Sequence, residues 1–392
     1  MTKLYLGTDV GGSLSKVFSI TNGTEKFGDL NNYVWEHDGY TDTHDHMAEE
    51  DGFKAWLDLS IKIDNSPQGD YKTDCVKITS KINNTRWLLG TLATSVSANA
   101  SKLPIGVKVK QYHFYLNIIS AIVVNMEERN IFETDLDLGV LLPARQYFQR
   151  DKIMIQEVLG GKITVKNNLT CEVFTIRLNK EEDIMIKPEA VVAINSCFIE
   201  NGKLTEFGKE FATKFNLVID IGENTTDIAG VKGSKPESLS FHSFEYAGGL
   251  LIQYIEQELQ RKLGYYPSRE EVLQAITEGY VTQGAGKEWV GEEVSEANRQ
   301  LAEKLFTDFT QIYLLTKNYR IQQIASFIFV GGGSIKIDKI KSVGEHFIDL
   351  VKEQSKNAVL FSPKNIRQAN IKGLADLMRK KYKDDTDSAL RA

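Results

Sequence analysis

The sequence predicts a two-lobed α/β fold, because one short pattern occurs twice in a chain long enough for two domains. An apolar strand, an Asp, a glycine turn and a run of polar residues follow one another at residues 4–16 and again at residues 217–227. Each copy continues into a return strand and so makes a strand–turn–strand unit. A chain of 392 residues can bury two separate cores. The duplication indicates two half-sites for one bound nucleotide.

The first glycine turn has the chemistry of a phosphate site. Glycine carries no Cβ, so the backbone N–H groups of such a turn can converge on an anion. Serine hydroxyls add donors, and a lysine adds a fixed positive charge for phosphate oxygens. The residues that we expect to contact phosphate are Gly11, Gly12, Ser13, Ser15 and Lys16.

The second turn repeats this chemistry with threonine in place of serine. Its expected phosphate contacts are Gly222, Asn224, Thr225 and Thr226. Asp9 and Asp220 end the strands that enter the two turns, where a carboxylate can hold Mg²⁺ through its water shell. Either turn alone is equally compatible with an ordinary β-hairpin, and neither matches the P-loop or the dinucleotide fingerprint.

Two further glycine clusters extend the pattern. After a buried strand, bare backbone lets a flat base or ribose approach closely, and before a helix it leaves N–H groups that attract anions. The clusters are Gly331, Gly332, Gly333 and Ser334 after the strand at 327–330, and Gly248 and Gly249 before a helix at 250–263. A strand-to-helix turn and a simple helix start, both without a ligand, are the alternatives.

Periodicity predicts the other elements. Strand patterns occur at residues 75–78, 86–89, 138–142, 162–165, 173–176 and 184–186. Helical spacing occurs at residues 109–129 and 269–324. This alternation of strands and helices is typical of an α/β protein.

The order of the three glycine motifs resembles the phosphate-1, phosphate-2 and adenosine motifs of the actin superfamily. That superfamily also contains sugar kinases and heat-shock chaperones. The chain is most similar to the ParM/StbA group of plasmid-segregating bacterial actins. Supporting stretches occur in the same order at residues 87–93, 141–145, 187–190 and 369–373.

The resemblance implies an actin-like fold, which is a duplicated ribonuclease H-like architecture with the nucleotide in a cleft between two lobes. The expected first lobe is residues 1–145, with an insertion at about 25–90. The expected second lobe is residues 146–365, with a small β-rich insertion at about 150–187. Residues 366–392 are expected to form a helix that returns to the first lobe, followed by a polar tail.

The resemblance also implies roles for acidic residues. Glu189 follows Pro188 at the start of a helix, where the family carries the glutamate that polarises the attacking water. A glutamate at that place is also favoured by the helix dipole alone. Asp220 would position Mg²⁺ and the same water, and Asp9 would support the waters of the metal. Glu223 and Asn224 depart from the family pattern, in which Gly and Thr are common there.

The implied activity is a nucleoside triphosphatase coupled to assembly of a homopolymeric filament. The protein would assemble with ATP or GTP and Mg²⁺, hydrolyse the nucleotide in the filament, and move plasmid DNA through a ParR-like, DNA-bound adaptor on a centromere-like site. A small-molecule kinase of the same superfamily and another actin-like cytoskeletal filament are the alternatives. No convincing substrate pocket or catalytic base for a kinase stands out in the sequence.

Composition limits the partners. The net charge of −6 argues against direct binding to nucleic acid, and residues 379–381 read as a solvated basic helix face. We expect no signal peptide, no membrane anchor and no membrane-spanning run, since the longest apolar stretch, residues 118–124, is too short. Three scattered cysteines fit a reducing cytoplasm.

A polar stretch at residues 28–53 is predicted to be an exposed surface loop. Its acidic and imidazole side chains could bind a transition metal, although no rigid frame holds them. They are His37, Asp42, His44, Asp45 and His46.

Overall fold

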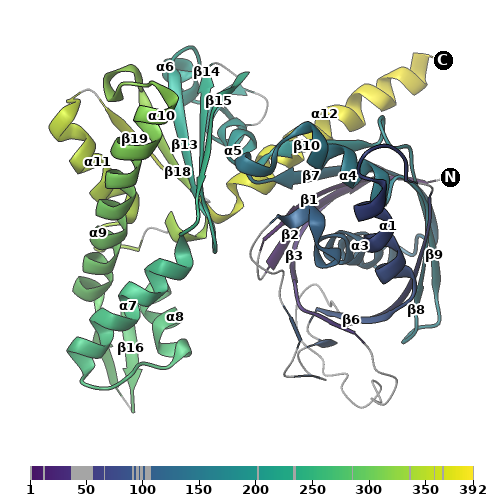
Figure 1. The fold of residues 1–392 in the computed structure, drawn as a ribbon, viewed down its shortest axis with the longest axis horizontal. Coiled ribbons are helices and arrows are strands. Elements are labelled where there is room, and N and C mark those ends of the chain that lie inside the picture. Colours follow the sequence, from purple (N-terminus) through teal and green to yellow (C-terminus); the bar gives the residue numbers. More distant parts are fainter. Residues whose placement is uncertain are drawn as a thin grey trace. The chain divides into compact units, whose positions relative to one another are not determined.

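The computed structural model of the chain divides into two compact units (Figure 1). Unit 1 comprises residues 1–189 and 371–392, and unit 2 comprises residues 190–370. The structure describes residues 2–11, 14–36, 56–65, 67–90, 92–93, 97, 100–101, 107–200, 203–232, 235–284, 286–334, 337–356, 358–363 and 366–391. Gly12, Ser13 and residues 37–53 of the predicted surface loop lie outside these ranges, so their predicted roles stay predictions. For residues 28–36 the loop prediction is wrong, because residues 28–31 and 34–36 lie in strands and bury Leu30 and Val34.

Unit 1 is built on one large sheet in the order β3-β2-β1-β7-β9-β8-β5-β6-β4, with β10 also paired to β7. The strands are β1 (Thr2–Val10), β2 (Leu14–Thr21), β3 (Thr24–Asn31), β4 (Val34–Glu36), β5 (Trp56–Asp64), β6 (Arg86–Gly90), β7 (Glu133–Leu142), β8 (Gly161–Asn167), β9 (Val173–Leu178) and β10 (Ile184–Pro188). β1 and β2 form the predicted antiparallel hairpin, whereas β1 pairs with β7 in parallel.

The core of unit 1 surrounds the apolar helix α3 (Tyr112–Glu127). Residues 113–126 of this helix are all buried, and the sheet curves around it in Figure 1. The other helices of unit 1 are α1 (Lys72–Asn83), η2 (Lys108–Lys110), η3 (Ala144–Gln146), α4 (Gln149–Leu159) and most of α12 (Ala369–Arg391). Residues 75–78, predicted as a strand, lie in α1, because Cys75, Ile78 and Ile82 follow helical spacing and bury one face of that helix.

The strands at residues 161–188 belong to the sheet of unit 1. β8 pairs antiparallel with β5, and β10 pairs in parallel with β7. The sequence analysis assigned this region to the second lobe, and strand pairing corrects that assignment. Alternating strands of five to seven residues carry no signal for the sheet that they join, because the pattern encodes only which face is buried.

Unit 2 contains a five-stranded sheet in the order β15-β14-β13-β18-β19. Its strands are β13 (Phe215–Ile221), β14 (Thr226–Lys232), β15 (Lys235–Phe244), β18 (Ser326–Val330) and β19 (Val359–Phe361). Two small hairpins add β11 (Ile199–Glu200), β12 (Lys203–Leu204), β16 (Tyr280–Gln283) and β17 (Gly286–Trp289). β13 pairs antiparallel with β14 and in parallel with β18, which repeats the arrangement of β1, β2 and β7.

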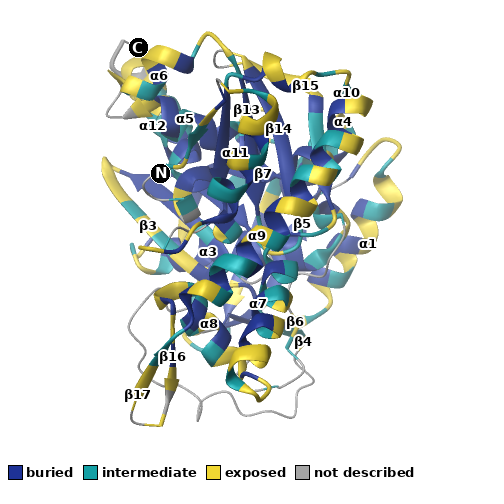
Figure 2. Ribbon diagram, turned by 90° about the vertical axis from the view of Figure 1, so that its left-hand side faces the viewer, coloured by how far each residue is buried: buried dark blue, intermediate teal, exposed yellow. Residues whose placement is uncertain are grey.

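Both faces of this second sheet are covered. Leu217 and Ile219 pack into a core with α7, α9 and α11, while Val218, between them, faces a smaller core with α5 and α6. Figure 2 shows the strands largely in the colour of buried residues. The helical elements are α5 (Glu189–Phe198), α6 (Glu206–Phe211), α7 (Gly248–Leu263), α8 (Arg269–Glu278), α9 (Gly291–Asp308), the π-helical η4 (Phe309–Leu314), α10 (Leu315–Lys317), η5 (Ile321–Gln323), η6 (Gly332–Ser334), α11 (Val343–Gln354) and η7 (Ile366–Gln368).

No helix in the described ranges is both long and apolar enough to cross a membrane.

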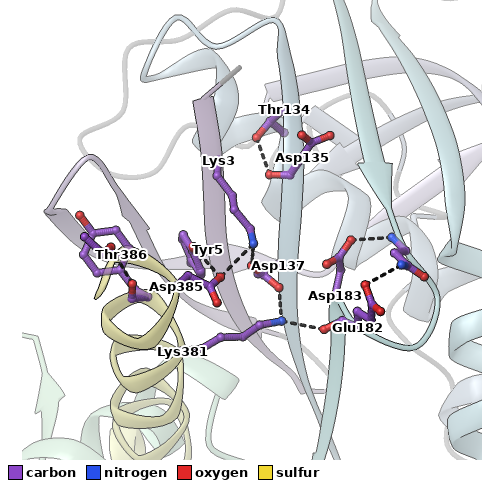
Figure 3. Close-up of polar contacts among 12 residues, drawn as sticks. Lys3, Tyr5, Thr134, Asp135, Asp137, Glu182, Asp183, Lys381, Asp385 and Thr386 are labelled. Atoms are coloured by element: carbon purple, nitrogen blue, oxygen red, sulfur yellow. Dashed lines mark hydrogen bonds and ion pairs between the residues drawn. The ribbon is translucent and has the colours of Figure 1, made fainter. Parts of the chain in front are cut away.

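A buried carboxylate fastens α12 to the sheet of unit 1 (Figure 3). Asp137 of β7 is fully buried; its Oδ2 lies 2.7 Å from Nζ of Lys3, and its Oδ1 accepts a hydrogen bond from Lys381 of α12. Lys3 also pairs with Asp385 of α12 at 2.9 Å, and the Tyr5 hydroxyl donates to the same Asp385 oxygen at 2.9 Å. Burial opposes the charge of Lys3, but the two carboxylates together raise its pKa above the usual value. The cluster therefore ties β1, β7 and α12 together by charge.

Replacing Lys381 tests this attachment. Lys381→Met leaves Asp137 with one cation fewer, and we expect the free energy of unfolding of unit 1 to fall by about 1.5–3 kcal/mol. Lys380→Met is the matched control, because the neighbouring Lys380 is exposed. Urea denaturation of both variants measures the difference, and equal midpoints would contradict the role of the Asp137 cluster.

Candidate nucleotide-binding site

The first turn places one carboxylate and one ammonium opposite each other. Asp9 at the end of β1 pairs in register with Lys16 on β2, and Lys16 Nζ lies 3.5 Å from Asp9 Oδ2. Asp9 is 6% exposed, so its charge is held at a nearly buried position. In such a pair the lysine can donate to a phosphate oxygen, and the carboxylate can accept hydrogen bonds from the waters of a metal ion.

Ser15 belongs to the framework of this turn. Its side chain is buried and donates a hydrogen bond of 2.6 Å to Oδ1 of Asn32, whose amide in turn donates to the carbonyl of Gly11 at 2.8 Å. The N–H of Gly11 donates to the carbonyl of Leu14 at 3.0 Å, and a Cβ at Gly11 would lie 2.7 Å from that oxygen. In this structure the proton of Ser15 is used inside the turn, and its contact with phosphate stays a prediction.

Lys108 is the residue that the sequence analysis missed in unit 1. Its Nζ donates to the carbonyl of Val10 at 2.7 Å and to Oε1 of Glu189 at 2.7 Å. Both side chains of this ion pair are nearly buried, at 14% and 11% exposure. The structure thus places Glu189, the first residue of α5, one lysine away from the first phosphate turn. Lys108 lies in no recognisable motif, so no local pattern could have identified it.

The second turn is held by its own threonines. Thr226 donates to the carbonyl of Tyr246 at 2.8 Å, and Thr225 donates to Oδ2 of Asp227 at 2.9 Å. Ser243 donates to the other oxygen of Asp227. The two threonine protons predicted to bind phosphate are thus directed to partners within unit 2. Burial and the nearby Asp308 carboxylate raise the pKa of the Tyr246 phenol well above its usual value, so this ring stays neutral.

The helix that follows Gly248 begins directly on the second turn. The N–H of Gly248 donates to the carbonyl of Gly222 at 3.0 Å, and the N–H of Gly249 donates to that of Glu223 at 2.9 Å. A Cβ at Gly248 would lie 2.9 Å from the same Gly222 oxygen. The glycine pair therefore lets α7 pack closely on the turn, and the predicted contact of these two residues with the nucleotide stays a prediction. Asn224, which follows Gly222 and Glu223 in the chain, is half-buried.

The third glycine motif packs against Asp220. Gly331 adopts φ of +88°, and a Cβ there would overlap Oδ1 of Asp220 and the carbonyl of Ile221. A Cβ at Gly333 would overlap the Ile221 side chain, whereas Gly332 has open space around the same position. The Ser334 hydroxyl donates to the carbonyl of Val330 at 2.8 Å, which closes η6. Packing therefore requires glycine at Gly331 and Gly333, whereas the space beside Gly332 is empty.

Asn370 holds the carboxylate of Asp220. Its amide nitrogen donates to Asp220 Oδ2 at 2.7 Å, and both residues are buried. The other amide atom of Asn370, Oδ1, is buried without a hydrogen-bond partner among the described residues. The stretch at 369–373 was noted in the sequence, but this contact joins residues 150 positions apart and only the fold reveals it.

These residues fit a nucleotide with Mg²⁺. Each unit presents one nearly buried aspartate at the end of a strand, beside a glycine turn, and unit 2 adds the open backbone of Gly332 and the unpaired Asn370 Oδ1. Within the part of the chain that the structure describes, no three His, Cys, Asp or Glu side chains gather as a metal site.

Comparison with known proteins establishes the fold class. A family model described as archaeal actin homologue MreB-like, C-terminal, matches residues 218–342, which all lie in unit 2. No curated protein matches the chain. Solved structures that resemble it include actin homologues, so the predicted α/β, actin-like fold and the resemblance to ParM-type proteins are confirmed.

Three of these structures cover nearly the whole chain. The actin-like protein Alp7A superposes with a TM-score of 0.69 at 17% identity, over 99% of this chain and 99% of its own. The archaeal actin homologue Ta0583 gives 0.66 at 17% identity, over 96% and 99%, and it has also been crystallised with ADP. ParM from a 15-stranded filament of Clostridium botulinum gives 0.59 at 14% identity, over 97% and 100%. At these identities the likeness concerns the fold.

Two glycine substitutions separate the packing role from the binding role of the third motif. Gly331→Ala forces a side chain onto Asp220 at a left-handed φ, so we expect it to destabilise unit 2 by about 1–3 kcal/mol. Gly332→Ala meets no neighbour, so its thermal midpoint should equal that of the wild type while its affinity for a fluorescent ADP analogue falls. Full affinity in Gly332→Ala would remove this backbone from the site.

Proposed function

We propose that the chain is a cytoplasmic, nucleotide-dependent, actin-like filament protein. It assembles with ATP or GTP, hydrolyses the nucleotide in the filament, and segregates plasmid DNA through a ParR-like, DNA-bound adaptor. The observation that carries the proposal is the repeated turn. The first strand of each hairpin, β1 or β13, carries a nearly buried aspartate just before its end and leads into a glycine turn and an antiparallel return strand. Each of these first strands also pairs with a parallel strand. The filament form of one similar protein and the ADP complex of another support it.

In the proposed mechanism each of the two turns contributes residues that bind nucleotide phosphate. Phosphoryl transfer to water depends mostly on positioning and on charge stabilisation. Mg²⁺ would supply the charge that neutralises the phosphate oxygens. Asp9 and Asp220 would hold its waters, Lys16 would bind phosphate, and Glu189 would orient the attacking water. Because a γ-phosphate contact can bias the conformation of a protein, the same residues would time assembly and disassembly.

Assembly requires a head-to-tail contact between identical subunits that does not close on itself. In unit 2, β15 and α10 lie at one end and α8 and β16 lie at the other, as Figures 1 and 2 both show. Leu239 of β15 and Leu315 of α10 are 81% and 74% exposed at one end, where His242 of β15 contacts Tyr313 of η4. Tyr266 before α8 is 73% exposed at the other end.

The charges of these two ends are opposite. The first end, residues 235–239 and 309–320, contains three Lys or Arg and one Glu, a net charge of +2. The second end, α8 with the β16–β17 hairpin, contains four Glu and two Lys or Arg, a net charge of −2. Apolar patches with complementary charge suit association of one copy with the next. We therefore propose that these ends form a contact between subunits.

The catalytic prediction concerns Glu189. Glu189→Gln removes the charge that orients water, so we expect phosphate release in the filament to fall by about 100-fold or more. Assembly with the triphosphate, followed by light scattering, should persist because the binding residues are intact. Glu181→Gln is the control, since Glu181 is exposed. Wild-type turnover in the Glu189 variant would refute its role.

The assembly prediction uses one variant at each end. Leu315→Asp places a negative charge at the positive end, and Tyr266→Lys places a positive charge at the negative end. Each new charge lies in an apolar contact and faces a partner end of the same sign, so neither variant alone should pellet with nucleotide and Mg²⁺. Each keeps one intact end, so an equimolar mixture should give a 1:1 dimer in analytical ultracentrifugation. Phe148→Asp, at an exposed residue of unit 1, is the control and should polymerise. Polymerisation of both end variants would locate the contact elsewhere.

A further inference from the structure

Lys108 joins three segments of unit 1 that are distant in the sequence. Its side-chain nitrogen binds the carbonyl of Val10 and the carboxylate of Glu189, each at 2.7 Å. Its backbone N–H donates to Oε1 of Gln146 at 2.8 Å, which fixes η2 against η3. One residue therefore contacts the first phosphate turn, the segment after β7 and the start of α5.

The strand order explains why a single lysine can reach these places. β1 pairs in parallel with β7, and β7 pairs in parallel with β10, so Val10, Leu142 and Pro188 end neighbouring strands at one edge of the sheet. Glu189 follows Pro188 directly, and the η3 turn follows β7. Lys108 lies across this edge, and its ammonium is largely removed from solvent.

We propose that Lys108 is a positioning residue for the hydrolytic step, holding the Glu189 carboxylate in one orientation beside the first phosphate turn. The proposal rests on the proposed function, in which Glu189 orients the attacking water. A charge-assisted hydrogen bond is short and directional, so it restricts the carboxylate to one rotamer. Each carboxylate oxygen has two lone pairs, so an oxygen that accepts from Lys108 can still accept from water.

The same ammonium also couples the turn to Glu189. Val10 immediately precedes Gly11, so any shift of the turn backbone that accompanies phosphate binding moves an acceptor of Lys108. Since Lys108 binds Glu189 through the same atom, the carboxylate responds to that shift. One side chain thereby links the turn to the water-orienting group, so a shift of the turn can reach Glu189 without the movement of a whole domain.

The test is a double-mutant cycle on hydrolysis. Lys108→Met should lower kcat by about 10-fold or more while KM for the nucleotide stays within about threefold, because the phosphate contacts are untouched. In a Glu189→Gln background, Lys108→Met should lower kcat no further, since it acts through Glu189. Lys110→Met is the matched control, because Lys110 lies in the same short helix but is exposed.

The cycle separates three outcomes. If Lys108→Met lowers kcat by the same factor with and without Glu189, Lys108 does not act through Glu189 and the inference is overturned while the proposed function stands. If Glu189→Gln itself keeps wild-type turnover, the catalytic part of the proposed function fails and the inference fails with it. Lys108→Met leaves the buried Glu189 carboxylate without its lysine and can therefore destabilise the protein. In that case the Lys108→Met/Glu189→Gln protein, which has no charge at residue 189, remains usable. Lys108→Arg, which keeps the positive charge, then replaces Lys108→Met as the single variant.

Discussion

Parallel strand pairing is the constraint on which the candidate site depends. The carboxyl ends of parallel neighbours lie at the same edge of a sheet, and ligands of open α/β sheets bind beyond that edge. In unit 1 this rule groups the ends of β1, β7 and β10, which carry Asp9, the η3 turn and Glu189. In unit 2 it groups the ends of β13 and β18, which carry Asp220 and the Gly331 motif. Neither group follows from proximity in the sequence.

Most of the described glycines that were predicted to bind an anion allow close packing within the protein. Gly248 and Gly249 donate to carbonyls of the second turn, and Gly331 leaves room for the Asp220 carboxylate. Ser15 and Thr226 likewise direct their protons into the protein. Buried polar groups must find partners, so a hydroxyl close to a tight turn is used first by the turn itself. In the described residues, each turn therefore offers a ligand an aspartate at its entrance, next to hydroxyl groups that are already used within the protein.

This explains which parts were predictable from the sequence. The strand–Asp–glycine pattern located Asp9 and Asp220 because the local chain alone makes those turns, and Pro188 marked the start of α5 before Glu189. Lys108 and Asn370 were not predictable as site residues, since each meets its partner only through the tertiary fold. For the same reason the pattern at 161–188 indicated strands but not their sheet. At residues 75–78 a short apolar alternation fitted a strand, although Ile82, one helical turn beyond Ile78, fits the helix that forms.

The Asp137 cluster and the Lys108–Glu189 pair of unit 1 differ in what their charges achieve. Removing ions from water is costly, and well-packed apolar side chains often stabilise a protein equally well. At Asp137 two lysines from β1 and α12 meet one carboxylate, so the charges specify where the last helix attaches. At Glu189 the carboxylate pairs with Lys108, which also donates to the backbone carbonyl of Val10 beside the first glycine turn. An apolar pair could fill that volume but could neither orient water nor respond to an anion. The proposed catalytic role thus gives a reason for keeping the Lys108–Glu189 pair charged, and packing alone gives none.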